Sequence, residues 1–128
     1  MQSPPSEPQR TLLVVDDDEA TLGLIGAFLR RNGYRVLTAP NPIRALEILQ
    51  REEVRLVITD LMMPHVDGIS FTEQIHAMPQ HAQVPVIMIT AYGDDALSDK
   101  SMRRGVAMTL KKPIQLTKLL DLVGFATH

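Results

Sequence analysis

Short apolar runs alternate with segments of helical periodicity along most of this 128-residue chain. The runs are rich in valine, isoleucine and leucine and lack the polar alternation of a half-exposed strand, which is typical of strands buried on both faces of a parallel sheet. They cover residues 12–15, 36–38, 56–59, 86–90 and 108–110. The pattern therefore predicts five strands.

Between these runs, apolar residues recur every three or four positions, as they do on one face of a helix. A first helix is expected to end before Gly33, with four inward residues: Leu24, Ile25, Phe28 and Leu29. A second begins at an Asn41 cap followed by Pro42. Others are expected over 68–78, over 94–105 and from Leu116 to Val123. Strict alternation of strands and helices predicts an α/β fold with a doubly wound parallel sheet.

Composition fits one domain over residues 10–128, since 45% of the chain is hydrophobic and 22% is charged. Residues 1–9 hold three prolines among polar residues and are expected to form a flexible leader. A net charge of −2 argues against direct nucleic-acid binding, and the absence of cysteine excludes disulfides and thiolate metal sites. No run is long enough for a membrane span and no secretory signal is present, so the cytoplasm is the expected compartment.

Polar residues follow the predicted strands at the edge where parallel strands bind ligands. They are Asp16 and Asp17 after the first strand, Asp60 after the third, Thr90 at the end of the fourth and Lys112 after the fifth. Three carboxylates in one crevice would repel each other unless a cation lay among them, and hard oxygen ligands suit Mg²⁺. The sequence therefore predicts a magnesium site at this edge.

A lysine ammonium and a threonine hydroxyl are suited to holding phosphoryl oxygens. Asp60 lies where its carboxylate could attack a phosphoryl group, and the product would be an aspartyl phosphate. Taken alone, an aspartate after a strand is more often a helix cap or a turn residue. The combination of all five side chains is what favours phosphoryl transfer over these structural roles.

Four stretches, LLVVDDDE, LVITDLMMPHVDG, VIMITAYGD and LKKPI, occur in this order between Thr11 and about Gly124. In sequence and spacing they resemble the receiver domain of bacterial two-component response regulators. The resemblance implies a flavodoxin-like five-stranded parallel sheet of order 2-1-3-4-5, flanked by five helices.

The resemblance also implies individual roles. Asp60 matches the phosphoacceptor, and Mg²⁺ would be held by Asp60, by Asp17 directly, by Asp16 mainly through water, and by the backbone carbonyl of Met62. Thr90 matches the hydroxyl that moves toward the phosphoryl group. Lys112 matches the phosphate-binding lysine, which commonly precedes a cis proline, here Pro113. Pro64, Asp67 and Gly68 match the loop after the phosphoacceptor and are interpreted as turn residues.

One position departs from the family pattern, because Thr109 stands where an aromatic switch residue is usual. Activation through the face formed by the fourth helix, fifth strand and fifth helix would therefore need another route. Residues up to 99 carry seven basic and fourteen acidic side chains, whereas residues 100–128 carry six and one. The expected output face is thus basic, and an acidic protein partner could meet Lys100, Arg103, Arg104 and Lys118.

The leading hypothesis is a signalling switch that takes a phosphoryl group from the phosphohistidine of a sensor histidine kinase or histidine phosphotransfer protein. Its catalysis would be confined to its own carboxylate, so no stand-alone enzyme is expected. Two alternatives are a pseudo-receiver that acts only as an interaction module, and a phosphatase resembling haloacid dehalogenases with Asp16 as nucleophile. Whether the chain works alone or within a longer protein stays open.

Overall fold

The computed structural model describes residues 10–63, 67–91 and 104–127. Five strands form one parallel sheet of order β2-β1-β3-β4-β5, which confirms the predicted fold. The strands are β1 (Thr11–Val15), β2 (Arg35–Ala39), β3 (Leu56–Asp60), β4 (Val86–Thr90) and β5 (Met108–Lys111). β1, β3 and β4 are buried along their whole length, as their mostly apolar sequences indicate.

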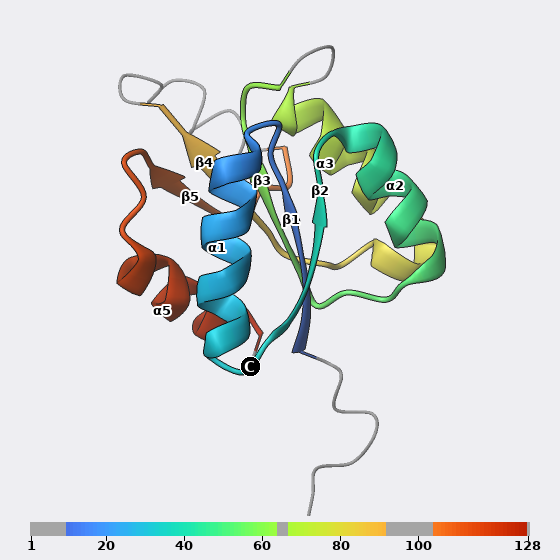
Figure 1. Cartoon of the computed structure of the whole chain (residues 1–128). Coiled ribbons are helices and arrows are strands. Elements are labelled where there is room, and N and C mark those ends of the chain that lie inside the picture. The colour runs from blue at the N-terminus through green and yellow to red at the C-terminus, as the bar shows by residue number, and fades with distance from the viewer. Residues whose placement is uncertain (1–9, 64–66, 92–103, 128) are drawn as a thin grey trace, which may run out of the picture.

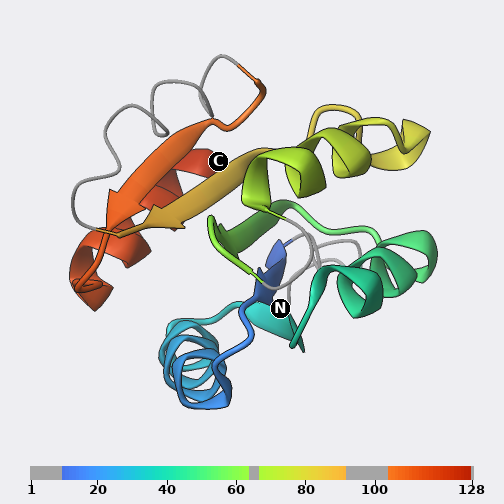
Figure 2. The same ribbon diagram turned by 90° about the horizontal axis from the view of Figure 1, so that it is seen from above.

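Helices cover both faces of this sheet (Figures 1 and 2). Helices α1 (Glu19–Arg31) and α5 (Leu116–Ala126) lie on one face, and α2 (Pro42–Arg51) and α3 (Gly68–His76) lie on the other, followed by a short 3₁₀ turn, η2 (Pro79–His81). The helix expected over 94–105 falls outside the described residues, except for Arg104 and Gly105, which form a turn. None of the helices in the described ranges is long and apolar enough to cross a membrane.

Alternate residues of each strand face opposite sides of the sheet and divide the core. One cluster lies under α1 and α5 and includes Ile25, Leu29, Leu119 and Val123. A second lies under α2 and α3 and includes Leu49, Phe71 and Ile75. A third, smaller cluster contains Leu61, Ile69, Met88 and Val106.

The prediction that Leu24 faces the core is wrong, because its side chain is 59% exposed. Helix α1 buries Leu22, Ile25 and Leu29, and a residue two positions after Leu22 is turned about 200° around the helix axis from it. Phe28 packs against the first cluster as expected.

Three helices begin with a side-chain cap, as the sequence predicted at Asn41. Asn41 accepts a hydrogen bond from the Arg44 amide, and Asp18 and Asp67 do the same for the amides of Thr21 and Ser70. At its other end, α1 stops where Gly33 adopts a φ of +96°, a conformation that favours glycine. These caps fix where each helix leaves the carboxyl edge of the sheet.

Candidate functional site

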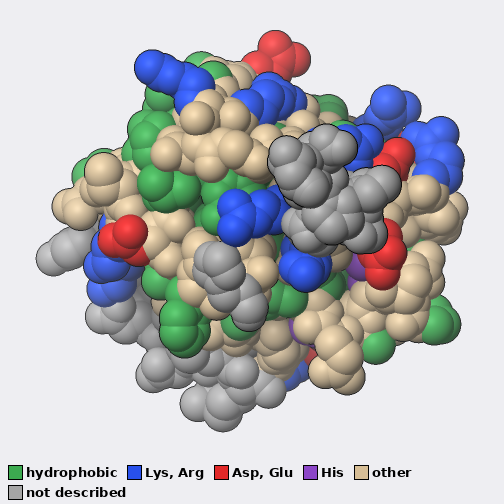
Figure 3. All heavy atoms as spheres, turned by 90° about the horizontal axis from the view of Figure 1, so that it is seen from below, with side chains coloured by type: hydrophobic (Ala, Val, Ile, Leu, Met, Phe, Trp, Pro, Cys, Tyr) green, Lys and Arg blue, Asp and Glu red, His purple; other side chains and the backbone are tan. Residues whose placement is uncertain are grey.

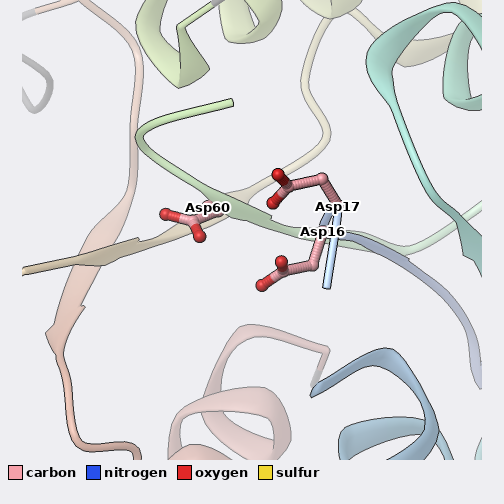
Figure 4. A group of neighbouring side chains, drawn as sticks. All are labelled: Asp16, Asp17 and Asp60. Carbon is pink, nitrogen blue, oxygen red and sulfur yellow. The ribbon is translucent and has the colours of Figure 1, made fainter. Parts of the chain in front are cut away.

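Three carboxylates meet at the carboxyl edge of the sheet, where β1 and β3 end side by side. Asp16 and Asp17 follow β1 and Asp60 ends β3; ligand oxygens of all three lie within 4.8 Å of one another. Figure 4 shows both carboxylates after β1 turned to the side on which Asp60 lies. At the opposite end of the molecule, acidic side chains are instead scattered among lysines and arginines (Figure 3). The predicted acidic residues are thus together at one edge.

Asp16 is the most enclosed member of this group, with 3% of its surface exposed. Its Oδ1 accepts a hydrogen bond of 2.9 Å from the Asp18 amide, so the turn that leads into α1 orients the carboxylate. Burial raises the pKa of Asp16, and the negative charges of Asp60 and Asp17 raise it further, against the lowering effect of the Asp18 amide and Lys112. An ionised Asp16 therefore destabilises the metal-free fold.

Replacing Asp16 by asparagine should stabilise the metal-free protein at neutral pH by about 1 kcal/mol, a rise in Tm of roughly 4 °C. Because the folded-state pKa of Asp16 is raised, its ionisation weakens the wild-type fold as pH increases from about 3.8 through that raised value. The gain should therefore shrink as the pH falls through this window. Thermal melts in EDTA measure it, with Asp121→Asn on the surface of α5 as the control. A lower Tm for Asp16→Asn would instead make Asp16 a structural cap.

Lys112 reaches the acidic group from the loop after β5. Its Nζ donates to Asp60 Oδ2 at 2.9 Å, and this contact, with the charges of all three aspartates, raises the pKa of the lysine. The Lys112–Pro113 peptide bond is cis, as the resemblance implied. Lys112 is thus a fully charged ammonium in contact with the expected phosphoacceptor.

In-line attack on phosphorus is simplest from a carboxylate oxygen that makes no other contact, but both oxygens of Asp60 accept hydrogen bonds. Lys112 contacts Oδ2, and the Met62 amide donates to Oδ1 at 3.3 Å, a long and therefore weak hydrogen bond. Only 6% of the surface of Asp60 is exposed. A phosphoryl group that bonds to Asp60 must therefore displace these contacts. Lys112 already lies beside a carboxylate oxygen of Asp60, from which it would move to a phosphoryl oxygen.

Thr90 ends β4, the strand next to β3, and is fully buried. Its Oγ1 has no hydrogen-bond partner, and among the described residues only His81 Nδ1 shares this condition. A buried hydroxyl without a partner is costly unless a ligand satisfies it. Thr90 therefore provides a donor for an anion beside Asp60.

Gly68, interpreted from the sequence as a turn residue, begins α3 directly behind Asp60. Its amide donates to the Leu61 carbonyl at 2.7 Å. A Cβ at this position would lie 2.7 Å from the Asp60 carbonyl oxygen and 3.0 Å from Leu61 Cα, too close for any side chain. Glycine at 68 thus lets α3 pack against the backbone of the phosphoacceptor, a requirement that turn propensity alone does not reveal.

The other residues named from the sequence lie elsewhere in the structure. Met62 is 63% exposed, and Lys111, the neighbour of Lys112, is exposed. Thr109 is half-buried on β5. Arg104 is exposed, and its Nε donates to Oε2 of Glu73 in α3 at 2.6 Å. Lys118 is exposed on α5, whereas Pro64, Lys100 and Arg103 fall outside the described residues.

The donor set suits a hard divalent cation such as Mg²⁺. It consists of carboxylate oxygens, and two of the three aspartates are buried. Burial, and after it the charges of Asp60 and Asp17, raise the pKa of Asp16, and a cation would offset both effects. Asp16, Asp17 and Asp60 would hold the ion, together with the backbone carbonyl of Met62. The arrangement thus combines a cation site, a carboxylate, an ammonium and an unsatisfied hydroxyl.

Comparisons with known proteins show the family to which this fold belongs. A family model described as "Response regulator receiver domain" matches residues 12–124. An uncharacterised 14.6 kDa protein of Leptolyngbya boryana is 35% identical over 115 residues, which cover 90% of this chain and 88% of that protein. Transcriptional regulatory protein GlrR of Escherichia coli is 37% identical over 90% of this chain, which spans only 26% of that regulator. A receiver domain structure from Clostridium thermocellum superposes with a TM-score of 0.85 at 28% identity, covering 91% of this chain and 93% of that one.

Proposed function

Because the chain belongs to the response regulator receiver domain family, we propose that it is a signalling switch in which Asp60 accepts a phosphoryl group. The observation that carries the proposal is the contact between Lys112 and Asp60 within a group of three carboxylates. A pseudo-receiver would not need this ion pair, and a phosphatase with Asp16 as nucleophile would need the lysine beside Asp16.

In the proposed reaction, one carboxylate oxygen of Asp60 forms a bond to phosphorus as the bond between phosphorus and the donor's histidine nitrogen breaks. The leaving imidazole keeps the electron pair and takes up a proton. Lys112 and the Thr90 hydroxyl bind phosphoryl oxygens, which replaces the Lys112–Asp60 contact and satisfies the buried Thr90 donor. A bound Mg²⁺ would neutralise negative charge on the carboxylates and the phosphoryl oxygens.

The proposed partners follow from this chemistry. The donor is the phosphohistidine of a sensor histidine kinase or histidine phosphotransfer protein in the cytoplasm. The output is a changed surface around β5 and α5 that contacts another protein or another part of a longer chain. GlrR, by its name, regulates transcription, and this chain matches only about a quarter of it, so such an output here is a proposal.

The proposal is tested with phosphoramidate, a small donor with the phosphorus–nitrogen bond of phosphohistidine. ³¹P NMR of the protein with Mg²⁺ and phosphoramidate should show a protein-bound resonance that is absent in EDTA. A folded protein that yields no such resonance would indicate an interaction module that phosphorylation does not regulate.

A further inference from the structure

Met88 lies between the carboxyl edge of the sheet, where Asp60 lies, and the start of β5. It precedes Thr90 by two positions on β4, so both side chains face the same side of the sheet. In the parallel register Met88 pairs with Thr109, the position that lacks an aromatic ring. Met88 itself is fully buried, whereas its neighbours Ile87 and Ile89 pack on the opposite face.

The third core cluster connects Met88 to Asp60. Leu61 directly follows Asp60 and is 1% exposed in this cluster. Its carbonyl accepts the Gly68 amide, and Met88 Cε lies only 3.0 Å from where a Cβ on Gly68 would stand. The Met88 side chain thus occupies the space that the glycine leaves beside the phosphoacceptor backbone.

The same cluster connects Met88 to the entry of β5 through Val106, which is 4% exposed. The two residues before Val106 are held against α3. Arg104 pairs with Glu73, and Gly105, at a φ of +108°, lies so close to His76 that a Cβ would be 3.0 Å from His76 Nδ1. A change in the shape of the cluster would therefore act on the short segment that leads into β5.

We propose that Met88 is the movable element that carries the state of Asp60 to Val106 and β5 in this chain. Methionine is unbranched with three rotatable bonds, so it changes rotamer within a buried cluster more readily than the β-branched Ile69 and Val106 around it. Reorientation of Thr90 toward a phosphoryl group shifts β4 next to Met88, and Met88 repacks against Leu61 and Val106. This inference rests on the proposed phosphorylation and states how the phosphorylation state of Asp60 reaches β5.

The test follows methionine methyl groups by NMR in protein labelled with [¹³C-methyl]methionine. Spectra are recorded with Mg²⁺ before and after addition of acetyl phosphate, and intact mass records phosphoryl uptake in the same sample. The Met88 resonance, assigned from its absence in Met88→Leu, should shift on phosphorylation. The Met78 resonance should stay in place, because Met78 packs on the second cluster beyond the end of α3.

Backbone amides provide the second measurement. Met88→Leu keeps an apolar side chain of similar size and should still take up a phosphoryl group, but the shifts of amides 106–110 on phosphorylation should be lost. The matched Met78→Leu variant should keep them. Uptake without movement of the Met88 methyl, or a wild-type amide response in Met88→Leu, would overturn the inference and leave the proposed function intact. A wild-type protein that gains no mass would overturn both.

Discussion

Replacing Asp60 by asparagine should abolish phosphoryl uptake from acetyl phosphate, whereas the wild-type protein gains one phosphoryl group per chain. The amide has nearly the size of the carboxylate, but its single oxygen can replace only one of the two that accept from Lys112 and from the Met62 amide. It cannot act as an oxygen nucleophile at neutral pH, because the amide oxygen, unlike a carboxylate oxygen, carries no negative charge. Intact mass measured after incubation with Mg²⁺ reports the loss directly.

Asp67→Asn is the matched control for this variant. Asp67 caps α3 close to Asp60 in sequence, and asparagine caps helices as well as aspartate does. The control removes one carboxylate of the same loop region and should keep full uptake. A phosphoryl group on Asp60→Asn would place the acceptor elsewhere and contradict the assigned chemistry.

Replacing Lys112 by alanine should slow phosphoryl uptake by about 100-fold, the effect of removing one preorganised charge from a transition state. Lys112 is the cation that contacts Asp60, and its raised pKa keeps it protonated throughout the neutral range. Without it, the negative phosphoryl oxygens would approach three carboxylates with less compensating charge. Time courses of mass gain at saturating Mg²⁺ measure the rate.

Lys118→Ala removes the same charge from an exposed position on α5 and should leave the rate with acetyl phosphate unchanged. Circular dichroism establishes that both variants are folded. Equal rates for Lys112→Ala and wild type would show that the ion pair with Asp60 is only structural.

Much of the fold could be predicted because the sequence pattern is local. Uninterrupted apolar runs marked the strands, and the structure extends four of them by one or two residues, for example by Thr11 before β1 and Asp60 after β3. Gly33 and Asn41 marked helix ends through conformational preferences of single residues. Leu24 was misplaced because spacing alone does not define the centre of the buried stripe of α1.

The members of the site could also be predicted, since parallel strands bring their carboxyl ends to one edge. Their contacts could not, because these depend on distant parts of the chain. Lys112 and Asp60 are 52 residues apart, and nothing in the local sequence indicates that the Lys112 ammonium contacts the Asp60 carboxylate directly. The role of Gly68 likewise depends on how closely α3 approaches β3. The Arg104–Glu73 pair joins residues 31 apart and was likewise not indicated by local sequence.

The most direct measurement of the central claim locates the phosphoryl group in the wild-type protein. Hydroxylamine cleaves acyl phosphates and leaves a hydroxamate on the carboxyl group, but it does not cleave the phosphate esters of serine or threonine. Protein treated with Mg²⁺ and acetyl phosphate, then with hydroxylamine, is digested and sequenced by mass spectrometry. We expect a hydroxamate at Asp60 that is absent when EDTA replaces Mg²⁺. A phosphate that survives hydroxylamine, or a hydroxamate at Asp16 or Asp17, would contradict the account.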